Sequence, residues 1–363
     1  MPILWRYLLR SYFQVFGLCV LSFISILLIF RFQEIAQFAA SGTPKPLLFL
    51  FILYQIPYIL PIAIPIACLI AAILLFQKLS FSCELTALRA AGLGLKTLVS
   101  PMIMTGLFLG LLNFTFSSEI STRCKGLSKQ MVYQATAVNP LFLLQKDTLV
   151  KFKNAYIDMK ALRAGKYAED VLVIMKNRDR LGVMLAKEFA LEGELLTGSQ
   201  VTFITHIDPK KDEGFDHVVV ENQATMSTKA SNLAQFIQDN QWMLATDYMP
   251  LRMVLAKKAL EKSSSRFSLS GADEEIARRL SLGFAAFTFT LMGTAFGMQI
   301  GRHRSKKGVF YALFLSLLFM VSFVTAKSFR HNPTIVLTLY LLPHALILFF
   351  SLFSLKRLSE GKE

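Results

Sequence analysis

Glu84, Ala87 and Leu88 fall on one face of a short helical pattern, and Leu85, Leu88 and Arg89 fall on an adjoining face. The set combines a carboxylate, a guanidinium and small or apolar side chains, which suits non-covalent docking rather than catalysis. Two interpretations are open: a solvated helix that lies on the membrane surface, or a coupling helix that docks into a partner protein.

These residues lie in a short polar interval, and the sequence from 79 to 92 reads LSFSCELTALRAAG. Ser80 or Ser82 can cap the start of a helix here, and Gly92 can end it. We therefore predict a helix at about residues 80–92. A helix this short is marginal alone in water, so we expect it to pack against something.

The chain lacks the sequence motifs of several classes of enzyme and nucleotide-binding protein. No phosphate-binding loop GxxxxGK[ST], HExxH, GxSxG or kinase signature is present, so ATP and Mg²⁺ are expected on a separate subunit and no cofactor on this one. The cysteines, which show no CxxC or histidine partner at metal-ligand spacing, predict neither a metal site nor a disulfide framework; they are Cys19, Cys68, Cys83 and Cys124.

The short helix lies between apolar segments that are each long enough to cross a bilayer. Hydrophobic residues make up 54% of the 363 positions. The predicted spans are about 12–32, 47–77 and 97–118, and then 278–300, 308–327 and 334–354. Span two contains Pro57, Pro61 and Pro65 and should be tilted, bent or broken in its outer half.

The polar stretch between the two sets of spans predicts a folded module of its own. Short alternating runs at 148–153, 171–175, 200–205 and 217–221, separated by turn-like groups, are typical of an all-β sandwich or barrel. Ser263–Gly271 resembles a linker. The predicted domains are 1–118 with three transmembrane helices, 119–274 with the strands, and 275–363 with three more transmembrane helices.

The charge of the short loops predicts the orientation. If the N-terminus is cytoplasmic, the inner side holds twelve basic residues, namely Arg6, Arg10, Lys78, Arg89, Lys96, Arg302, Arg304, Lys306, Lys307, Lys356, Arg357 and Lys362. The outer side then holds four, namely Arg31, Lys45, Lys327 and Arg330. This bias places both termini in the cytoplasm and the strand-rich module outside. It also accounts for much of the net charge of +15 without nucleic-acid binding.

The stretch ELTALRAAG at 84–92 resembles the signature of the lipopolysaccharide export permeases of the LptF/LptG family. The opening YLLR at 7–10 is similar to theirs, as is Arg279-Leu280 before span four, with Gly297 and a basic 302–307 loop after it. The three-plus-three layout also resembles this family over the whole chain. The residues Phe81-Ser82-Cys83 depart from the more polar residues that family members often carry.

The resemblance implies an α-helical bundle of six transmembrane helices with an inserted, jellyroll-like periplasmic domain. It implies a paired homologous permease, a cytoplasmic ATPase dimer, a bitopic periplasmic jellyroll protein and lipopolysaccharide as partners in the bacterial inner membrane. On this match Glu84 would bind a basic group in an ATPase groove, and Arg89 would hold the helix or contact a carboxylate. Leu85 and Leu88 would be its apolar anchor.

Basic residues at the outer ends of spans are candidate substrate contacts. Side chains at this depth usually extend to the membrane interface, which is the simpler interpretation. The resemblance implies instead that Lys327 at the end of span five, together with Arg31 and Arg330, contacts phosphates of lipid A.

Two other functions remain open. A mechanotransmission-type subunit would pass force to periplasmic partners without carrying lipid, and a plain membrane anchor would only display a binding domain. A mechanotransmission-type subunit tends to have fewer spans around its outer domain, so the three-plus-three arrangement argues against it. A plain anchor would not need proline-bent spans or a capped cytoplasmic helix.

Overall fold

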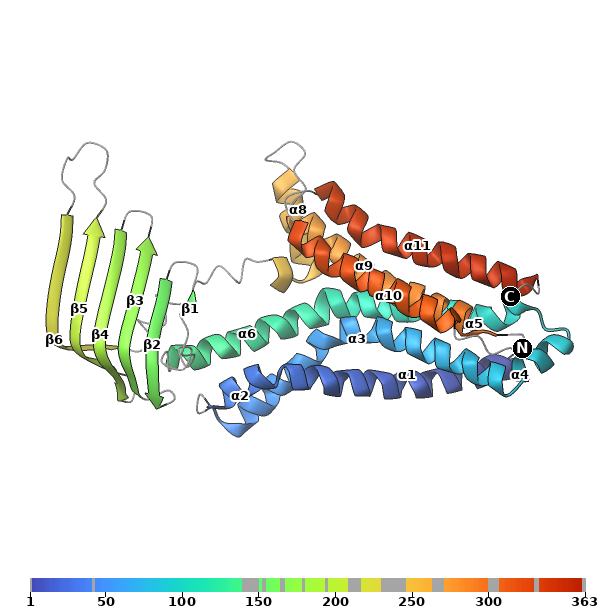
Figure 1. Ribbon diagram of the computed structural model, residues 1–363, viewed down its shortest axis with the longest axis horizontal. Coiled ribbons are helices and arrows are strands. Elements are labelled where there is room, and N and C mark those ends of the chain that lie inside the picture. The colour runs from blue at the N-terminus through green and yellow to red at the C-terminus, as the bar shows by residue number, and fades with distance from the viewer. Residues whose placement is uncertain are drawn as a thin grey trace. The chain divides into compact units, whose positions relative to one another are not determined.

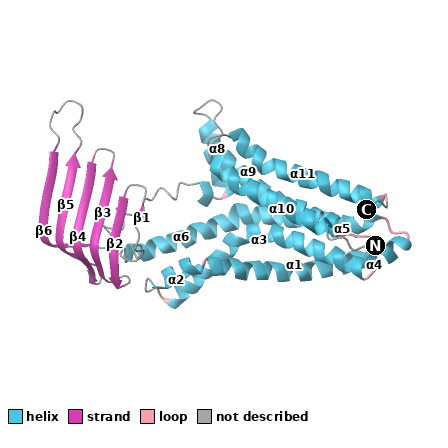
Figure 2. Cartoon of the chain, viewed as in Figure 1, coloured by secondary structure: helices cyan, strands magenta, loops and turns pink. Residues whose placement is uncertain are grey.

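The computed structural model describes residues 2–40, 43–138, 150–151, 155–163, 167–177, 180–192, 195–207, 217–229, 246–262, 271–299, 307–329 and 333–360. Within these residues six helices are long and apolar enough to cross a membrane. They cover Ile3–Phe30, Lys45–Phe81, Leu95–Val132, Gly271–Gly297, Lys307–Phe329 and Thr334–Ser359. Three precede the strands and three follow them, as the sequence predicts (Figures 1 and 2).

The chain divides into two compact units. The first contains Met1–Phe30, Leu53–Gly126 and Leu244–Glu363, which hold most of the helices; the second contains Arg31–Ile52 and Leu127–Met243, which hold the strands. The helical unit is built from α1 (Pro2–Phe30), α3 (Lys45–Phe81), α4 (Glu84–Ala90), α5 (Leu95–Thr115), α9 (Gly271–Gly297), α10 (Lys307–Ala326) and α11 (Pro333–Ser359).

Helix α3 remains helical through its prolines, so a break in this span is not what the structure has. Pro65 has no N–H, and therefore the carbonyl of Pro61 one turn earlier loses its helical donor. Asn113 on α5 replaces that donor: its Nδ2 lies 3.1 Å from the Pro61 oxygen and 2.8 Å from the Leu282 oxygen on α9. One buried amide thus joins three membrane helices.

Helix α9 packs closely against its neighbours because glycines face them. A Cβ added at Gly293 would lie 2.6 Å from the Ala72 Cβ and 2.7 Å from the Leu69 carbonyl oxygen on α3. Gly283 is similarly close to Phe114 on α5. Small residues at such positions allow backbones to approach, which is how membrane helices gain packing energy.

The third span does not end near residue 118 as predicted. Helix α5 continues through a π-helical turn, Phe116–Ile120, into α6 (Ser121–Val138). The helix becomes polar after residue 118. Hydropathy therefore predicts where the apolar part ends, but it does not predict where the helix ends. A helix, α8 (Leu251–Lys262), also lies inside the region predicted as all β.

The strands form one antiparallel sheet in which each strand pairs with the next along the chain, from β1 to β6. They are β1 (Val150–Lys151), β2 (Ala155–Arg163), β3 (Tyr167–Asn177), β4 (Arg180–Glu192), β5 (Leu195–Ile207) and β6 (His217–Lys229). The runs at 171–175, 200–205 and 217–221 are confirmed as strands, and 148–153 is described only at β1. Strands β2 and β4 were missed. A jellyroll has two packed sheets, whereas the described strands form one.

A single apolar cluster defines one face of the sheet. It contains Val171, Val173, Met184, Phe189 and Val201 among its buried members. The second unit also contains α2 (Phe32–Ala40), where Phe38 stacks on Phe51 with ring centres 4.4 Å apart. The predicted linker, Ser263–Gly271, lies outside the described residues except for Gly271, which begins α9.

Candidate functional site

The predicted amphipathic helix is present as α4, from Glu84 to Ala90. Its start differs from the prediction. Cys83 is the N-cap residue, in a left-handed conformation with φ 59°, and makes no side-chain capping hydrogen bond. The Ser80 hydroxyl donates to the Phe76 carbonyl at 2.8 Å, and the Ser82 hydroxyl donates to the Lys78 carbonyl at 2.9 Å. Both serines therefore bond α3 rather than cap α4.

The end of α4 is as predicted. Gly92 has φ +81°, a conformation that glycine adopts without strain. The Gly92 N–H donates to the Arg89 carbonyl at 3.0 Å, and the Leu93 N–H donates to the Leu88 carbonyl at 3.1 Å. These two bonds form a Schellman motif, which terminates the helix sharply.

Glu84 is bonded to this chain's own residues. Its Oε2 accepts a hydrogen bond from the Tyr7 hydroxyl on α1 at 2.9 Å, and its Oε1 accepts one from the Ser82 hydroxyl at 2.9 Å. No sequence pattern pairs Tyr7 with Glu84, although both lie in stretches that resemble the permease family. The carboxylate consequently joins the first membrane helix to α4.

Leu85 is fully buried in the apolar core of the bundle. The same cluster contains Leu8 of α1, Leu98 of α5 and Leu358 of α11. Leu85 therefore anchors α4 to the bundle, and its side chain is not on a surface that a partner could reach. Leu88 is partly buried against the same cluster, and Ala87 is exposed.

The end of α9 is bonded to the α3–α4 junction as well. The backbone N–H of Gln299, just after α9, donates to the Ser80 hydroxyl oxygen at 3.1 Å. Through Leu85, helix α4 therefore shares the apolar cluster that includes residues of α1, α5 and α11, and the turn before it is bonded to the chain just after α9. Both ends of the described chain lie close to α4 in Figure 1.

The three candidate lipid contacts have different surroundings. Lys327 is exposed, in a short 3₁₀ turn, Lys327–Phe329, that follows α10. Arg31 pairs with Glu34 one turn along, with Nη1 to Oε1 at 2.6 Å. Arg330 lies outside the described residues.

A buried ionic network lies at the other end of α9, where the sequence predicts no functional site. Arg279 is completely buried, and its Nε lies 2.7 Å from Glu275 Oε1. Its other nitrogens donate to the backbone carbonyls of Ser118, Thr246 and Met249 at 3.2, 3.3 and 2.7 Å. One guanidinium thus bonds α9, the π-helical turn and the segment before α8.

A lysine on α6 belongs to the same end of the bundle. The Lys125 Nζ lies 3.9 Å from Asp247 Oδ2 and 4.6 Å from the centre of the Tyr248 ring. A cation held between a carboxylate and an aromatic face is stabilised by both. Together with Arg279, Lys125 fixes the segment at 246–249 against the helices.

A third polar contact crosses the middle of the bundle. His344 on α11 is buried, and its ring nitrogens lie 3.0 Å from the Ser281 hydroxyl and 3.2 Å from the Thr288 hydroxyl on α9. No candidate partner occurs near this histidine in the sequence. Its partners are 63 and 56 positions away.

Among the described residues, no group of three or more His, Cys, Asp or Glu side chains is placed to hold a metal ion. The candidate site at α4 is a short helix with exposed residues, a buried leucine and a bonded carboxylate. Its geometry suits the transfer of motion from outside the bundle to several membrane helices.

A sequence model of the family described as "Lipopolysaccharide export system permease LptF/LptG" matches residues 6–357 of the 363. No curated protein matches the chain. The family match covers both sets of spans, α4 and the strands. The chain therefore belongs to the LptF/LptG family of lipopolysaccharide export system permeases.

Proposed function

We propose that this multi-pass inner-membrane protein is the permease subunit of an ABC transporter. It extracts lipopolysaccharide from the inner membrane and passes it to a periplasmic bridge toward the outer membrane. The chain pairs with a homologous permease above a cytoplasmic ATPase dimer, which binds the ATP and Mg²⁺. The observation that supports this most directly is the attachment of α4 to the bundle through Leu85 and Glu84.

Helix α4 is the proposed coupling element. Ala87 and the exposed residues beside it, Thr86 and Ala90, form the face that enters a groove on the ATPase. Leu88 and Arg89 border this face. Leu85 lies inside the bundle, so a displacement of α4 is passed to the apolar cluster that Leu85 shares with residues of α1, α5 and α11.

Glu84 has two proposed roles in turn. Without the partner it accepts the Tyr7 and Ser82 hydroxyl groups. With the ATPase bound, a basic group of the groove adds a charge-assisted hydrogen bond to the same carboxylate, and such bonds are stronger than neutral ones. Docking then changes how firmly α1 is held.

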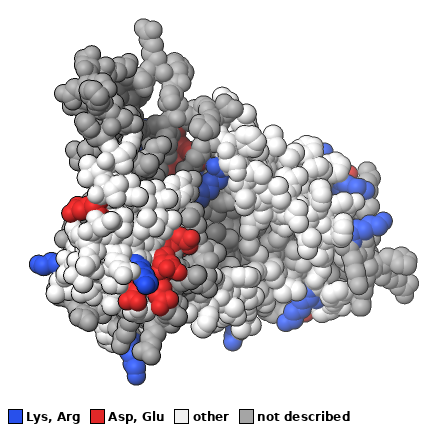
Figure 3. Space-filling view, turned by 60° about the vertical axis from the view of Figure 1, so that its left-hand side comes forward, with Lys and Arg blue, Asp and Glu red and all other residues white. Residues whose placement is uncertain are grey.

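The orientation is also proposed from charge. Figure 3 shows the visible face of the helices as largely uncharged, with basic side chains toward its right-hand end. Exposed basic residues at the α4 end include Arg6, Arg10, Lys96 and Lys356. An excess of Lys and Arg is typical of the cytoplasmic side, and this supports the proposal that α4 and both termini are cytoplasmic and the strands periplasmic.

The strand-rich unit is proposed to receive the lipid. A jellyroll-like arrangement would be shared with a bitopic periplasmic partner that accepts the lipid next, and the apolar cluster of the sheet, buried in this structure, would open to acyl chains. At the periplasmic surface of the inner membrane, the exposed ammonium of Lys327 is proposed to bind a phosphate of lipid A. Arg31 and Arg330 are further candidates, Arg31 by exchanging Glu34 for a phosphate.

The coupling role is tested with Ala87→Arg, which places a long charged side chain on the docking face and leaves Glu84 and Leu85 in place. The matched control is Ala39→Arg, at an exposed alanine of α2. With the ATPase and the paired permease co-expressed, Ala87→Arg should reduce captured ATPase at least tenfold, and the control should not. Normal capture by Ala87→Arg would refute docking through this face.

The transport role is tested separately by mass spectrometry of the complex after gentle detergent extraction. Lipopolysaccharide bound to the wild-type complex supports extraction. An ATPase-bound complex that holds no lipopolysaccharide would favour the force-transmitting subunit instead. A permease that captures no ATPase would favour the membrane anchor.

A further inference from the structure

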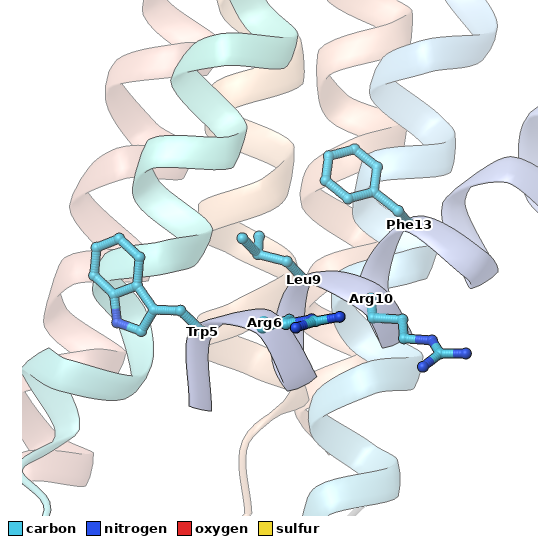
Figure 4. Close-up of a pocket in the computed structure, with 5 residues that line it drawn as sticks. All are labelled: Trp5, Arg6, Leu9, Arg10 and Phe13. Carbon is cyan, nitrogen blue, oxygen red and sulfur yellow. The ribbon is translucent and has the colours of Figure 1, made fainter. Parts of the chain in front are cut away.

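A groove lies along the first turns of α1 and is not part of the coupling site. It is lined by Trp5, Arg6, Leu9, Arg10 and Phe13. Trp5, Leu9 and Phe13 recur every four residues, and so do Arg6 and Arg10, which gives an apolar row beside a basic pair. Figure 4 shows the three apolar side chains on one side of the helix and the two guanidinium groups on the other.

The basic pair is open to a ligand. Arg6 and Arg10 are both exposed, and neither forms an ion pair with a residue that the structure describes. Like charges one helical turn apart repel each other, so an anion that bridges them would be stabilised. Glu84, which bonds Tyr7 of α1, already accepts hydrogen bonds from two hydroxyl groups, those of Tyr7 and Ser82.

The depth of the groove indicates the kind of anion. The span containing α1 begins at Ile3, so these residues occupy the interfacial end of a membrane helix. Tryptophan and arginine are typical of that depth. From Arg6 to Phe13 the helix rises about 10 Å, which matches the distance from a headgroup phosphate to the upper part of an acyl chain. A soluble phosphate would leave the apolar row without a partner.

We propose that this groove binds a glycerophospholipid with an anionic headgroup, with its phosphate at Arg6 and Arg10. An acyl chain lies along Leu9 and Phe13, and Trp5 packs near the glycerol backbone. The assignment to the cytoplasmic leaflet rests on the orientation proposed above. A lipid held here would brace α1 next to Tyr7, the residue that joins this helix to α4.

The test uses the full chain alone in lipid nanodiscs. The protein has two tryptophans, so Trp242→Phe leaves Trp5 as its sole tryptophan. Brominated acyl chains quench tryptophan fluorescence at short range. Quenching of Trp5 is compared between nanodiscs that contain brominated phosphatidylglycerol and nanodiscs that contain the same fraction of brominated phosphatidylcholine.

Phosphatidylglycerol should be preferred at the groove by about fivefold or more, since each basic residue near the surface contributes about a fivefold preference for anionic lipid. Arg6→Gln/Arg10→Gln should remove the preference. The matched control Lys96→Gln/Lys356→Gln removes the same charge at the same end of the bundle, outside the groove, and should keep the preference within about twofold. Inorganic phosphate should not displace the lipid.

Equal quenching by both lipids in the wild-type background would overturn the proposal. An equal loss of preference in both double variants would also overturn it, because it would mean diffuse attraction by surface charge. Circular dichroism checks that each variant keeps its helical content. No ATPase or lipopolysaccharide is present, so a negative result here leaves the coupling proposal untouched, and failure of the Ala87→Arg test leaves this one untouched.

Discussion

The Tyr7 hydroxyl lies 2.9 Å from Glu84 Oε2 and bonds α1 to α4 across 77 positions of sequence. This bond lies at the surface, whereas Leu85 one residue later is fully buried among leucines of α1, α5 and α11. Helix α4 is therefore held by adjustable polar contacts at Glu84 and by apolar packing at Leu85 and Leu88. The polar contacts are the ones that a docking partner can change.

Tyr7→Phe should weaken coupling without preventing assembly. The ring keeps its packing, and only the donor to Glu84 is lost, at a cost of about 1 kcal/mol for an ordinary hydrogen bond. We expect lipopolysaccharide extraction per ATP hydrolysed to fall about fivefold in a reconstituted complex, with ATPase capture unchanged. Tyr311→Phe, at an exposed tyrosine of α10, is the control. Unchanged extraction in Tyr7→Phe would mean that this bond carries no coupling.

Asn113→Leu should destabilise the bundle in a way that one second change can repair. The substitution leaves the buried Pro61 carbonyl without its donor, at a cost of about 1 kcal/mol or more. Pro65→Ala restores an N–H one turn after Pro61, and therefore the double variant should recover most of that loss. Unfolding in a denaturing detergent measures the free energies. Simple additivity of the two changes would show that Asn113 does not replace the missing helical donor.

Arg279→Gln should be much more destabilising than Arg278→Gln. Both arginines pair with Glu275, but only Arg279 is fully buried and bonds three backbone carbonyls. Arg278 still pairs with Glu275 in this variant, so the loss comes from the buried guanidinium and its bonds to three carbonyls, and should cost about 3 kcal/mol. The Arg278 side chain is 28% exposed, so its loss should cost far less. Limited proteolysis should also cut the 246–249 segment faster in Arg279→Gln alone. Equal effects of the two changes would contradict a special role for Arg279 in holding the 246–249 segment.

Lys327→Glu tests the proposed phosphate contact. Reversing this exposed charge should weaken the lipopolysaccharide stimulation of ATP hydrolysis about tenfold and leave basal hydrolysis nearly unchanged. The control is Lys45→Glu, at an exposed lysine near the start of α3, where the orientation also predicts the outer side. If basal and stimulated hydrolysis fell together, the change would have damaged folding, and a role in lipid binding would not follow.

The sequence by itself determined the six spans, the strand-rich insert and α4, because each depends on a local pattern. About 20 consecutive apolar residues require a bilayer-spanning helix, alternation requires a strand with one buried face, and Gly92 can end a helix in a conformation closed to most residues. The family resemblance, confirmed over residues 6–357, rests on the same local motifs.

Only the tertiary structure decided what each side chain bonds. The partners of Glu84, Asn113, Arg279 and His344 include residues from 30 to 169 positions away, and no local pattern encodes those pairs. The polar continuation of span three into α6 and the burial of Leu85 were decided in the same way. A buried donor, carbonyl or leucine takes whichever neighbour the packed helices bring to it, and that choice exists only once the bundle has formed.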